Sequence, residues 1–201
     1  MEKIKIWLLS LLVLAAFSGV AQNHDISVGV ENNEYAWVGY SYRGHWVARV
    51  SNSFFFDEAS SQYVRLSGGY WHSVGGFDLA GMVQYGQNYG NDYHTIGALL
   101  SAGFGWRFLN PQVAIMPYYD SVLDYHTCYS AGLGFRVTKE VEIGGYATNI
   151  PEFRTVEDKV KLYAKFRVGR LEVKPEFCFP FEKGKIRSRF LFGFSYSFPP
   201  F

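Results

Sequence analysis

Basic side chains at alternate positions could form a surface that holds anions. Lys161, Lys165 and Arg167 share one parity in a stretch whose other parity is apolar. If such side chains face a narrow pore, the low-dielectric surround focuses their positive field and attracts small anions or acidic sugars. The residues that we assign to this inner, anion-contacting face are Arg49, Arg65, Arg107, Arg136, Lys161, Lys165, Arg167, Lys174, Arg187 and Arg189.

Alternatively, acidic side chains inside the protein could neutralise these cations. Lys161 and Lys165 would face Glu172 and Glu176 across one predicted hairpin, and opposite charges in cross-strand positions stabilise a sheet. Basic residues outnumber acidic ones on this face, and buried cations without counter-charges are costly. The excess favours some contact with anions. A conducting lumen and an ion-paired, filled lumen stay open as alternatives.

His126, Cys128 and Ser130 carry the residue types of a base and a nucleophile. Residues two apart in a strand lie about 6.5–7 Å from each other, too far for contact within the triplet. A partner such as Glu142 on a neighbouring strand would be needed, so we interpret the triplet as structural. Metal-ligand spacing is not found among the remaining histidines, which are His24, His45, His72 and His94. We predict no metal and no cofactor.

Strands must position these side chains, because the hydrophobic pattern has a period of two almost throughout. Between residues 159 and 168, apolar residues at even positions alternate with Lys, Tyr or Arg at odd positions. The whole pattern predicts an antiparallel up-and-down β-barrel of about twelve strands, or about ten if the first hairpin does not form. The predicted strands are 25–31, 35–42, 45–52, 62–71, 76–86, 95–108, 112–119, 123–137, 140–149, 159–168, 170–179 and 186–198.

The predicted connections alternate between tight turns and longer polar loops, an asymmetry typical of barrels that cross an outer membrane. The tight turns are Arg43-Gly44, His72 to Gly75, Leu109-Asn110-Pro111, Thr138-Lys139 and Gly169. The longer loops are Asn52 to Ser61, Gln87 to His94, Asn149 to Asp158 and Pro180 to Lys185. Pro117 and Pro175 fall within predicted strands, and each is expected to mark a bulge or a strand end because proline cannot donate to the ladder.

The apolar faces of the strands are expected to point outward to lipid. Polar faces carry small residues such as Ser130, Gly132 and Gly134, which suit a crowded lumen. The chain also contains 15 Tyr, 18 Phe and 5 Trp, more bulk than one small barrel interior can hold. Aromatic residues gather near both ends of the strands, as at membrane interfaces. A soluble secreted β-sandwich or lipocalin-like barrel is the alternative.

Cys128 and Cys178 are the two cysteines of the chain. Both fall on polar faces of predicted strands that are three apart in order. Neighbouring strands lie about 4.8 Å apart, so the pair is too distant for a disulfide. We predict two free thiols.

The first residues have the pattern of a secretory signal. Lys3 and Lys5 precede an apolar run from Ile6 to Phe17, and Gly19-Val20-Ala21 forms a small-residue cleavage site. This apolar run is shorter than the stretch of about 20 residues that a helix needs to span a membrane. We therefore expect a signal peptide over 1–21 and one barrel domain over 22–201. A formal net charge of +1 gives no reason to expect a nucleic-acid partner.

The signal and the terminal aromatic pattern together resemble those of small bacterial outer-membrane β-barrel proteins. The terminal residues Phe190, Phe192, Phe194, Tyr196 and Phe198 are similar to the β-signal that the barrel-assembly machinery recognises. Pro199-Pro200-Phe201 departs from this pattern, because the last Phe is out of phase. The resemblance implies residence in the bacterial outer membrane, contact with lipid and lipopolysaccharide, and assembly by that machinery.

Arg49-Val50-Ser51-Asn52 resembles the His-x-Ser-Asn motif of lipid A 3-O-deacylase barrels. Arginine stands at the position of the base and cannot accept a proton from serine, which argues against an enzyme. The sequence thus favours a non-enzymatic membrane barrel, monomeric by default, with a narrow, basic pore for small anionic solutes. The alternatives are a non-conducting structural or surface-interaction barrel and a lipid A-modifying enzyme.

Overall fold

The computed structural model describes residues 24–31, 35–43, 45–55, 62–89, 92–151, 156–181 and 188–198. The predicted signal peptide (1–21), Arg187 and the terminal residues 199–201 lie outside these ranges. The described residues contain no helix long and apolar enough to cross a membrane, a finding that has no bearing on strands.

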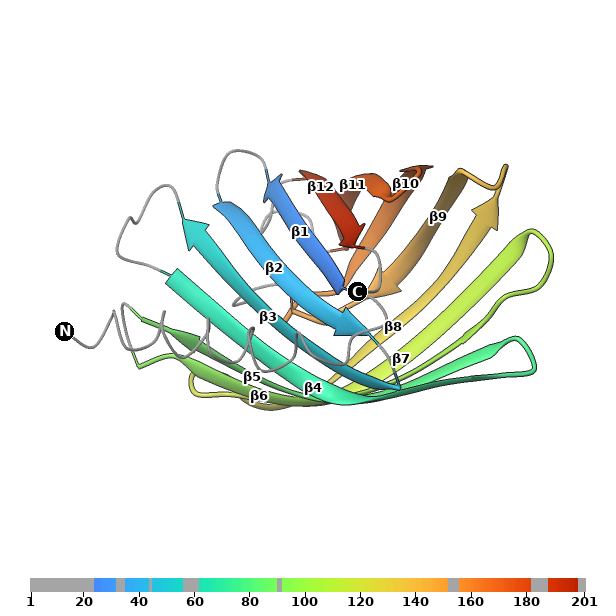
Figure 1. Cartoon of the computed structure of the whole chain (residues 1–201). Helices are drawn as coiled ribbons and strands as arrows, with labels where there is room; N and C mark the ends of the chain where they lie inside the picture. The colour runs from blue at the N-terminus through green and yellow to red at the C-terminus, as the bar shows by residue number, and fades with distance from the viewer. Residues whose placement is uncertain are drawn as a thin grey trace.

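Twelve antiparallel strands form one closed barrel (Figure 1). Each strand pairs with its neighbours in sequence, and the first strand closes the barrel by pairing with the last. The predicted fold class and strand number are therefore confirmed. The strands are β1 (His24–Glu31), β2 (Tyr35–Arg43), β3 (Trp46–Phe55), β4 (Gln62–Val74), β5 (Phe77–Asn88), β6 (His94–Phe104), β7 (Leu109–Asp120), β8 (Asp124–Arg136), β9 (Val141–Thr148), β10 (Lys159–Val168), β11 (Leu171–Pro180) and β12 (Arg189–Phe198).

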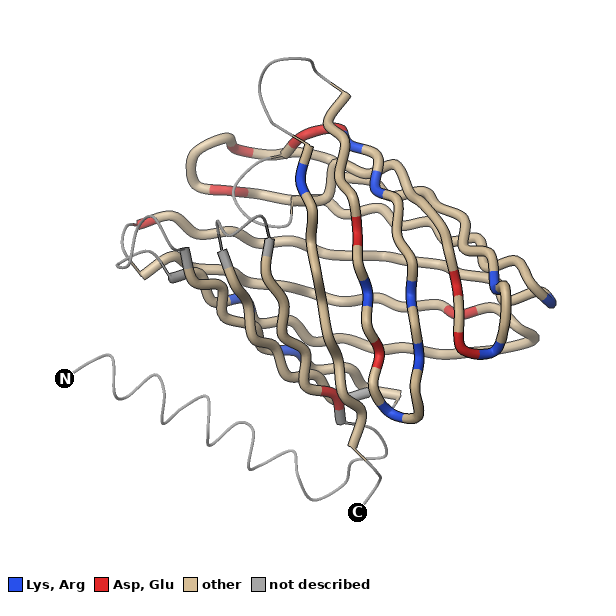
Figure 2. Tube along the Cα trace, turned by 90° about the horizontal axis from the view of Figure 1, so that it is seen from above, with Lys and Arg blue, Asp and Glu red and all other residues tan. Residues whose placement is uncertain are grey.

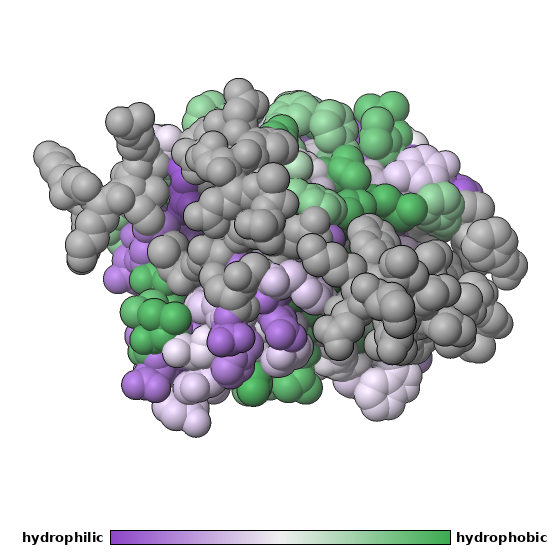
Figure 3. Space-filling view, turned by 90° about the vertical axis from the view of Figure 1, so that its left-hand side faces the viewer, coloured by the Kyte–Doolittle hydropathy of each residue, from purple (hydrophilic) through white to green (hydrophobic). Residues whose placement is uncertain are grey.

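The barrel buries polar side chains and exposes apolar ones. On β10, Lys161 is 1% exposed and the adjacent Leu162 is 50% exposed. Val83 on β5 and Leu133 on β8 are likewise more than half exposed. Figure 3 shows apolar side chains along the margins of one end of the molecule and a group of hydrophilic ones nearer the middle. This arrangement is the inverse of a soluble barrel and matches the predicted orientation.

The expectation of bulges or strand ends at Pro117 and Pro175 is wrong. Pro117 stays within β7 and opposite Thr127 of β8, while pairing to β6 is interrupted on its other side. Pro175 likewise keeps its place opposite Phe192, and pairing to β10 is interrupted beside it. The register is unchanged across both gaps. A strand that pairs on two sides can lose the ladder on one of them without bending.

Two predicted turns are displaced. The β4–β5 turn is Gly75-Gly76, with φ of +58° and +84°, rather than His72 to Gly75. Leu109-Asn110-Pro111 begins β7, and the preceding turn occupies residues 105–108. Arg107 sits in that turn with φ +49°. The predicted strand 95–108 is thus too long. Cys128 and Cys178 are free, as predicted, and both are fully buried.

Candidate functional site

Charged residues concentrate on the wall formed by β9, β10 and β11 (Figure 2). Acidic and basic side chains form ion pairs on this wall. Lys161 and Lys174 both contact Glu176, with N–O distances of 2.6 and 2.7 Å. Lys165 lies 3.5 Å from Glu142 on the neighbouring strand. Pairing of Lys161 with Glu176 agrees with the prediction.

The prediction that Lys165 pairs with a glutamate of β11 is wrong. Lys165 instead pairs with Glu142, which lies on β9. Glu172 instead accepts a hydrogen bond of 2.9 Å from Nε of Arg167, in an exposed pair near the β10–β11 turn. Register explains the difference. Lys165 lies opposite Glu142 in the β9–β10 ladder, and Arg167 lies opposite Glu172 in the β10–β11 ladder.

Two tyrosines complete this wall. Tyr146 donates a hydrogen bond of 2.9 Å to Glu176, and Tyr163 donates one of 3.0 Å to Glu142. The ammonium group of Lys174 lies 5.5 Å from the Tyr146 ring centre and 4.9 Å from that of Tyr163. Hydroxyl donors and ring faces therefore hold both partners of each ion pair in place.

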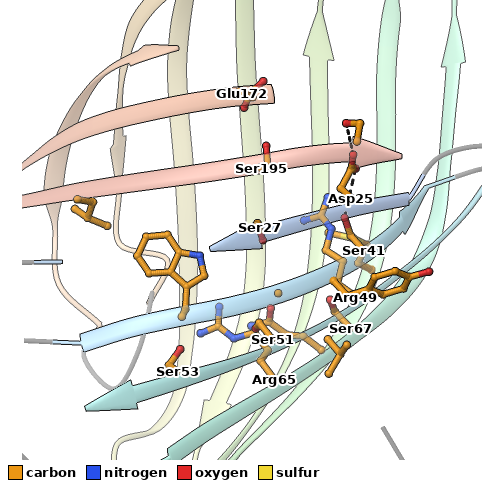
Figure 4. Close-up of a pocket in the computed structure, with 18 of the residues that line it drawn as sticks. Asp25, Ser27, Ser41, Arg49, Ser51, Ser53, Arg65, Ser67, Glu172 and Ser195 are labelled. Atoms are coloured by element: carbon orange, nitrogen blue, oxygen red, sulfur yellow. Dashed lines mark hydrogen bonds between the residues drawn. The ribbon is translucent and has the colours of Figure 1, made fainter. Parts of the chain in front are cut away.

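The opposite wall is lined by small hydroxyl side chains around a cavity of about 860 Å³. Asp25 accepts hydrogen bonds from Ser41, at 3.5 Å, and from Ser197. Figure 4 shows this cavity with Asp25 and Glu172 among the residues that line it. Its serines, which come from β1, β2, β3, β4 and β12, are Ser27, Ser41, Ser51, Ser53, Ser67, Ser195 and Ser197.

Arg49 and Arg65 bring positive charge to the serine-lined cavity. Arg49 lies opposite Ser67 and Arg65 lies opposite Ser51 in the β3–β4 ladder, so both guanidinium groups project from one face of the sheet. The Arg65 guanidinium lies 5.5 Å from the Tyr63 ring centre. Cations among hydroxyl groups can bind an anionic, hydroxylated solute through charge and hydrogen bonds.

A constriction that the sequence did not reveal lies at the end with the longer connections. Met116, Tyr118 and Cys128 form a buried cluster, and Ile150 and Val156 from the segment after β9 pack against it. The carbonyl of Pro151 in that segment accepts a 3.5 Å hydrogen bond from Arg65. The sequence signal for this constriction was the apolar pair Ile150-Pro151, inside a loop that was expected to be polar. The described part of the loop therefore narrows the lumen.

The other basic residues that were predicted to line the lumen lie in three different environments. Arg189 projects into the lumen, where Nη2 lies 2.6 Å from Glu157. Arg136 ends β8 and is exposed, beside Glu142 at the rim. The turn residue Arg107 is exposed, with its guanidinium 5.8 Å from the Trp106 ring centre, so it lies outside the lumen-facing strands.

His126, Cys128 and Ser130 share one strand face but form no catalytic arrangement. Nε2 of His126 is buried and has no hydrogen-bond partner in the part of the chain that the structure describes. Cys128 packs in the apolar cluster instead. No cluster of three or more metal-binding side chains occurs within those residues either.

The aromatic residues of β12 lie on its outer face. Phe190, Phe194 and Tyr196 are between 38% and 44% exposed, while the intervening Leu191 is buried. Phe192 and Phe198 are half-buried on the same outward parity. The face predicted to carry the assembly signal is thus the outer face of the strand that closes the barrel.

Comparisons with known proteins find similarity in structure and not in sequence. No family model and no curated protein matches the chain. The KdgM porin, solved in complex with disordered oligogalacturonate, has a TM-score of 0.71 and 10% identity, covering 88% of this chain and 99% of its own. Omp33, an outer membrane protein of Acinetobacter baumannii, has a TM-score of 0.55 and 10% identity, covering 89% of this chain and 98% of its own. The chain has the closed β-barrel fold found in these outer-membrane proteins.

Proposed function

We propose that the protein is an integral barrel of a bacterial outer membrane and forms a narrow pore with a basic lumen for small anionic solutes. The observation that carries this proposal is the cavity of about 860 Å³, which Arg49, Arg65 and serine hydroxyls line inside a barrel with an apolar exterior. A polar, hydrated path through a low-dielectric sleeve is what small charged solutes need to cross a bilayer.

The shared fold adds support by analogy. The KdgM porin has been solved in complex with an oligogalacturonate, an acidic sugar. The serine and arginine side chains of this chain offer the hydroxyl and guanidinium groups that a hydroxylated anion would contact. The narrowing around Ile150 limits the path to small solutes.

The same proposal covers export and assembly. Residues 1–21 act as the signal, and Phe190, Phe192, Phe194, Tyr196 and Phe198 are recognised by the barrel-assembly machinery. Outward exposure of this aromatic face supports the second step. Lipid and lipopolysaccharide surround the finished barrel. A mature N-terminus at Gln22, read by mass spectrometry of protein from membranes, tests the first step.

Planar-bilayer recording of the refolded protein tests the pore. Stepwise currents are expected, with a reversal potential in a salt gradient that indicates preference for anions. Arg49→Gln and Arg65→Gln should each lower the anion preference by about ten-fold at low salt, since a unit charge about 10 Å away contributes roughly 1.7 kcal/mol at an effective dielectric constant of about 20.

Arg107→Gln is the matched control, because it removes the same charge from an exposed turn outside the lumen. An unchanged preference in this variant is expected. If the wild-type protein gives no currents in the bilayer, a non-conducting structural or surface-interaction barrel is favoured instead. A mass change in lipid A on overexpression would favour the enzyme, for which Ser51 and Asn52 are the residues to replace.

A further inference from the structure

Two lysines face each other across the β10–β11 pair. Tyr163 lies opposite Glu176 and Phe166 lies opposite Val173, and this register places Lys165 opposite Lys174. Like charges directly opposite each other destabilise a sheet. The backbone ladder is also interrupted at this point, beside Pro175. Each lysine therefore needs acceptors nearby that offset this repulsion.

Both lysines contact a carboxylate of this wall. Glu176 is shared by Lys161 and Lys174, and Glu142 contacts Lys165. Lys165 and Lys174 thus each form one ion pair within the described residues, at 3.5 and 2.7 Å. Each of these two ammonium groups has three N–H donors, so each has donors for a further acceptor.

The ammonium groups of Lys165 and Lys174 border one cavity. A space of about 240 Å³ is lined by Lys165 and Lys174, together with Gln112, Ser130 and Tyr163. The two ammonium groups flank one ring, at 5.7 and 4.9 Å from the Tyr163 centre. A cavity of this volume holds about eight waters at liquid density, which is room for a small hydrated oxyanion.

We propose that Lys165 and Lys174 form a binding site for a small oxyanion, a carboxylate or a phosphate, separate from the cavity at Arg49 and Arg65. This inference deepens the proposed function and rests on its water-filled lumen. The oxyanion would accept hydrogen bonds from both ammonium groups. Gln112 and Ser130 provide neutral donors at the same cavity.

Isothermal titration of the detergent-refolded protein with inorganic phosphate tests this site, with acetate and chloride titrated at the same ionic strength. Phosphate should bind and chloride should not. Tighter binding of acetate than of phosphate would identify carboxylates as the preferred class within the proposal. Lys165→Gln and Lys174→Gln should each weaken phosphate binding about ten-fold or more, the effect of removing one charge-assisted hydrogen bond.

Lys139→Gln is the matched control, since Lys139 is exposed in the β8–β9 connection, and it should leave phosphate binding unchanged. Lys174→Arg should retain binding because it keeps the charge. If the glutamine variants do not fold, the wild-type titration alone still decides: no heat with phosphate, or equal heat with chloride, overturns the site. Phosphate binding without bilayer currents would retain the site and reject the pore, whereas anion-selective currents without phosphate binding would reject the site alone.

Discussion

Glu176 neutralises two lysines at once on the lumen wall. Its two oxygens lie 2.6 Å from Lys161 and 2.7 Å from Lys174, and Tyr146 donates a further hydrogen bond. Lys161 is only 1% exposed, so the carboxylate compensates it for hydration lost on burial. Removing one partner of a buried pair leaves a charge that water cannot reach.

Glu176→Gln should therefore lower the free energy of unfolding by about 3–5 kcal/mol. Glu172→Gln is the control, because its pair with Arg167 is exposed and should contribute less than about 1 kcal/mol. Urea unfolding of protein refolded in lipid vesicles, followed by tryptophan fluorescence, measures both. Equal losses in the two variants would contradict the assigned roles.

The sequence pattern placed Lys161 and Glu176 on one face, but it could not select every partner. Alternation along a strand fixes which way a side chain points. The choice between Glu142 and Glu172 for Lys165 depends on the registers of two separate hairpins, and register depends on contacts distant in sequence. Arg107 was predicted to line the lumen because the hydrophobic pattern does not show that β6 ends at Phe104.

Strands were the most predictable elements, because a half-buried strand repeats its pattern over many residues. The turns predicted at residues 72–75 and 109–111 are displaced because the hydrophobic pattern does not mark the ends of these strands. β4 continues through residues 72–74 before the chain turns at Gly75-Gly76, and β7 begins at Leu109 and continues through Pro111. The packing of β1 against β2 could not be read from the pattern at all. There Gly29 lies opposite Trp37, and a Cβ at Gly29 would stand 2.1 Å from two carbons of the indole ring.

Gly29→Ala should consequently destabilise the barrel by about 1–3 kcal/mol, the usual cost of overpacking. Gly68→Ala is the control, because the nearest atom to its Cβ would be a backbone oxygen 3.8 Å away. The same vesicle unfolding assay applies. Trp37→Ala should remove the difference between glycine and alanine at position 29; a loss that persists without the indole would show that the contact is not its cause.

At the scale of the whole molecule, the chain places apolar side chains outside and polar ones inside. The sequence predicted this inversion because small residues alternate with bulky ones, as in β8. The inward position of Ile150 and Pro151 was not predicted, since a loop has no repeating pattern to orient its side chains. Ile150 packs there against the buried cluster of Met116, Tyr118 and Cys128.

Adjacent residues on β4 provide the most direct test of this inside-out arrangement. Leu66 is 49% exposed on the outer surface, and Ser67 lines the cavity. Single cysteines at these positions, in a Cys128→Ala, Cys178→Ala background, can carry spin labels in protein refolded into vesicles. The label at position 66 should be relaxed by oxygen, which partitions into lipid, and the label at 67 by a water-soluble nickel complex. The reverse pattern, or water access at both positions, would contradict the account.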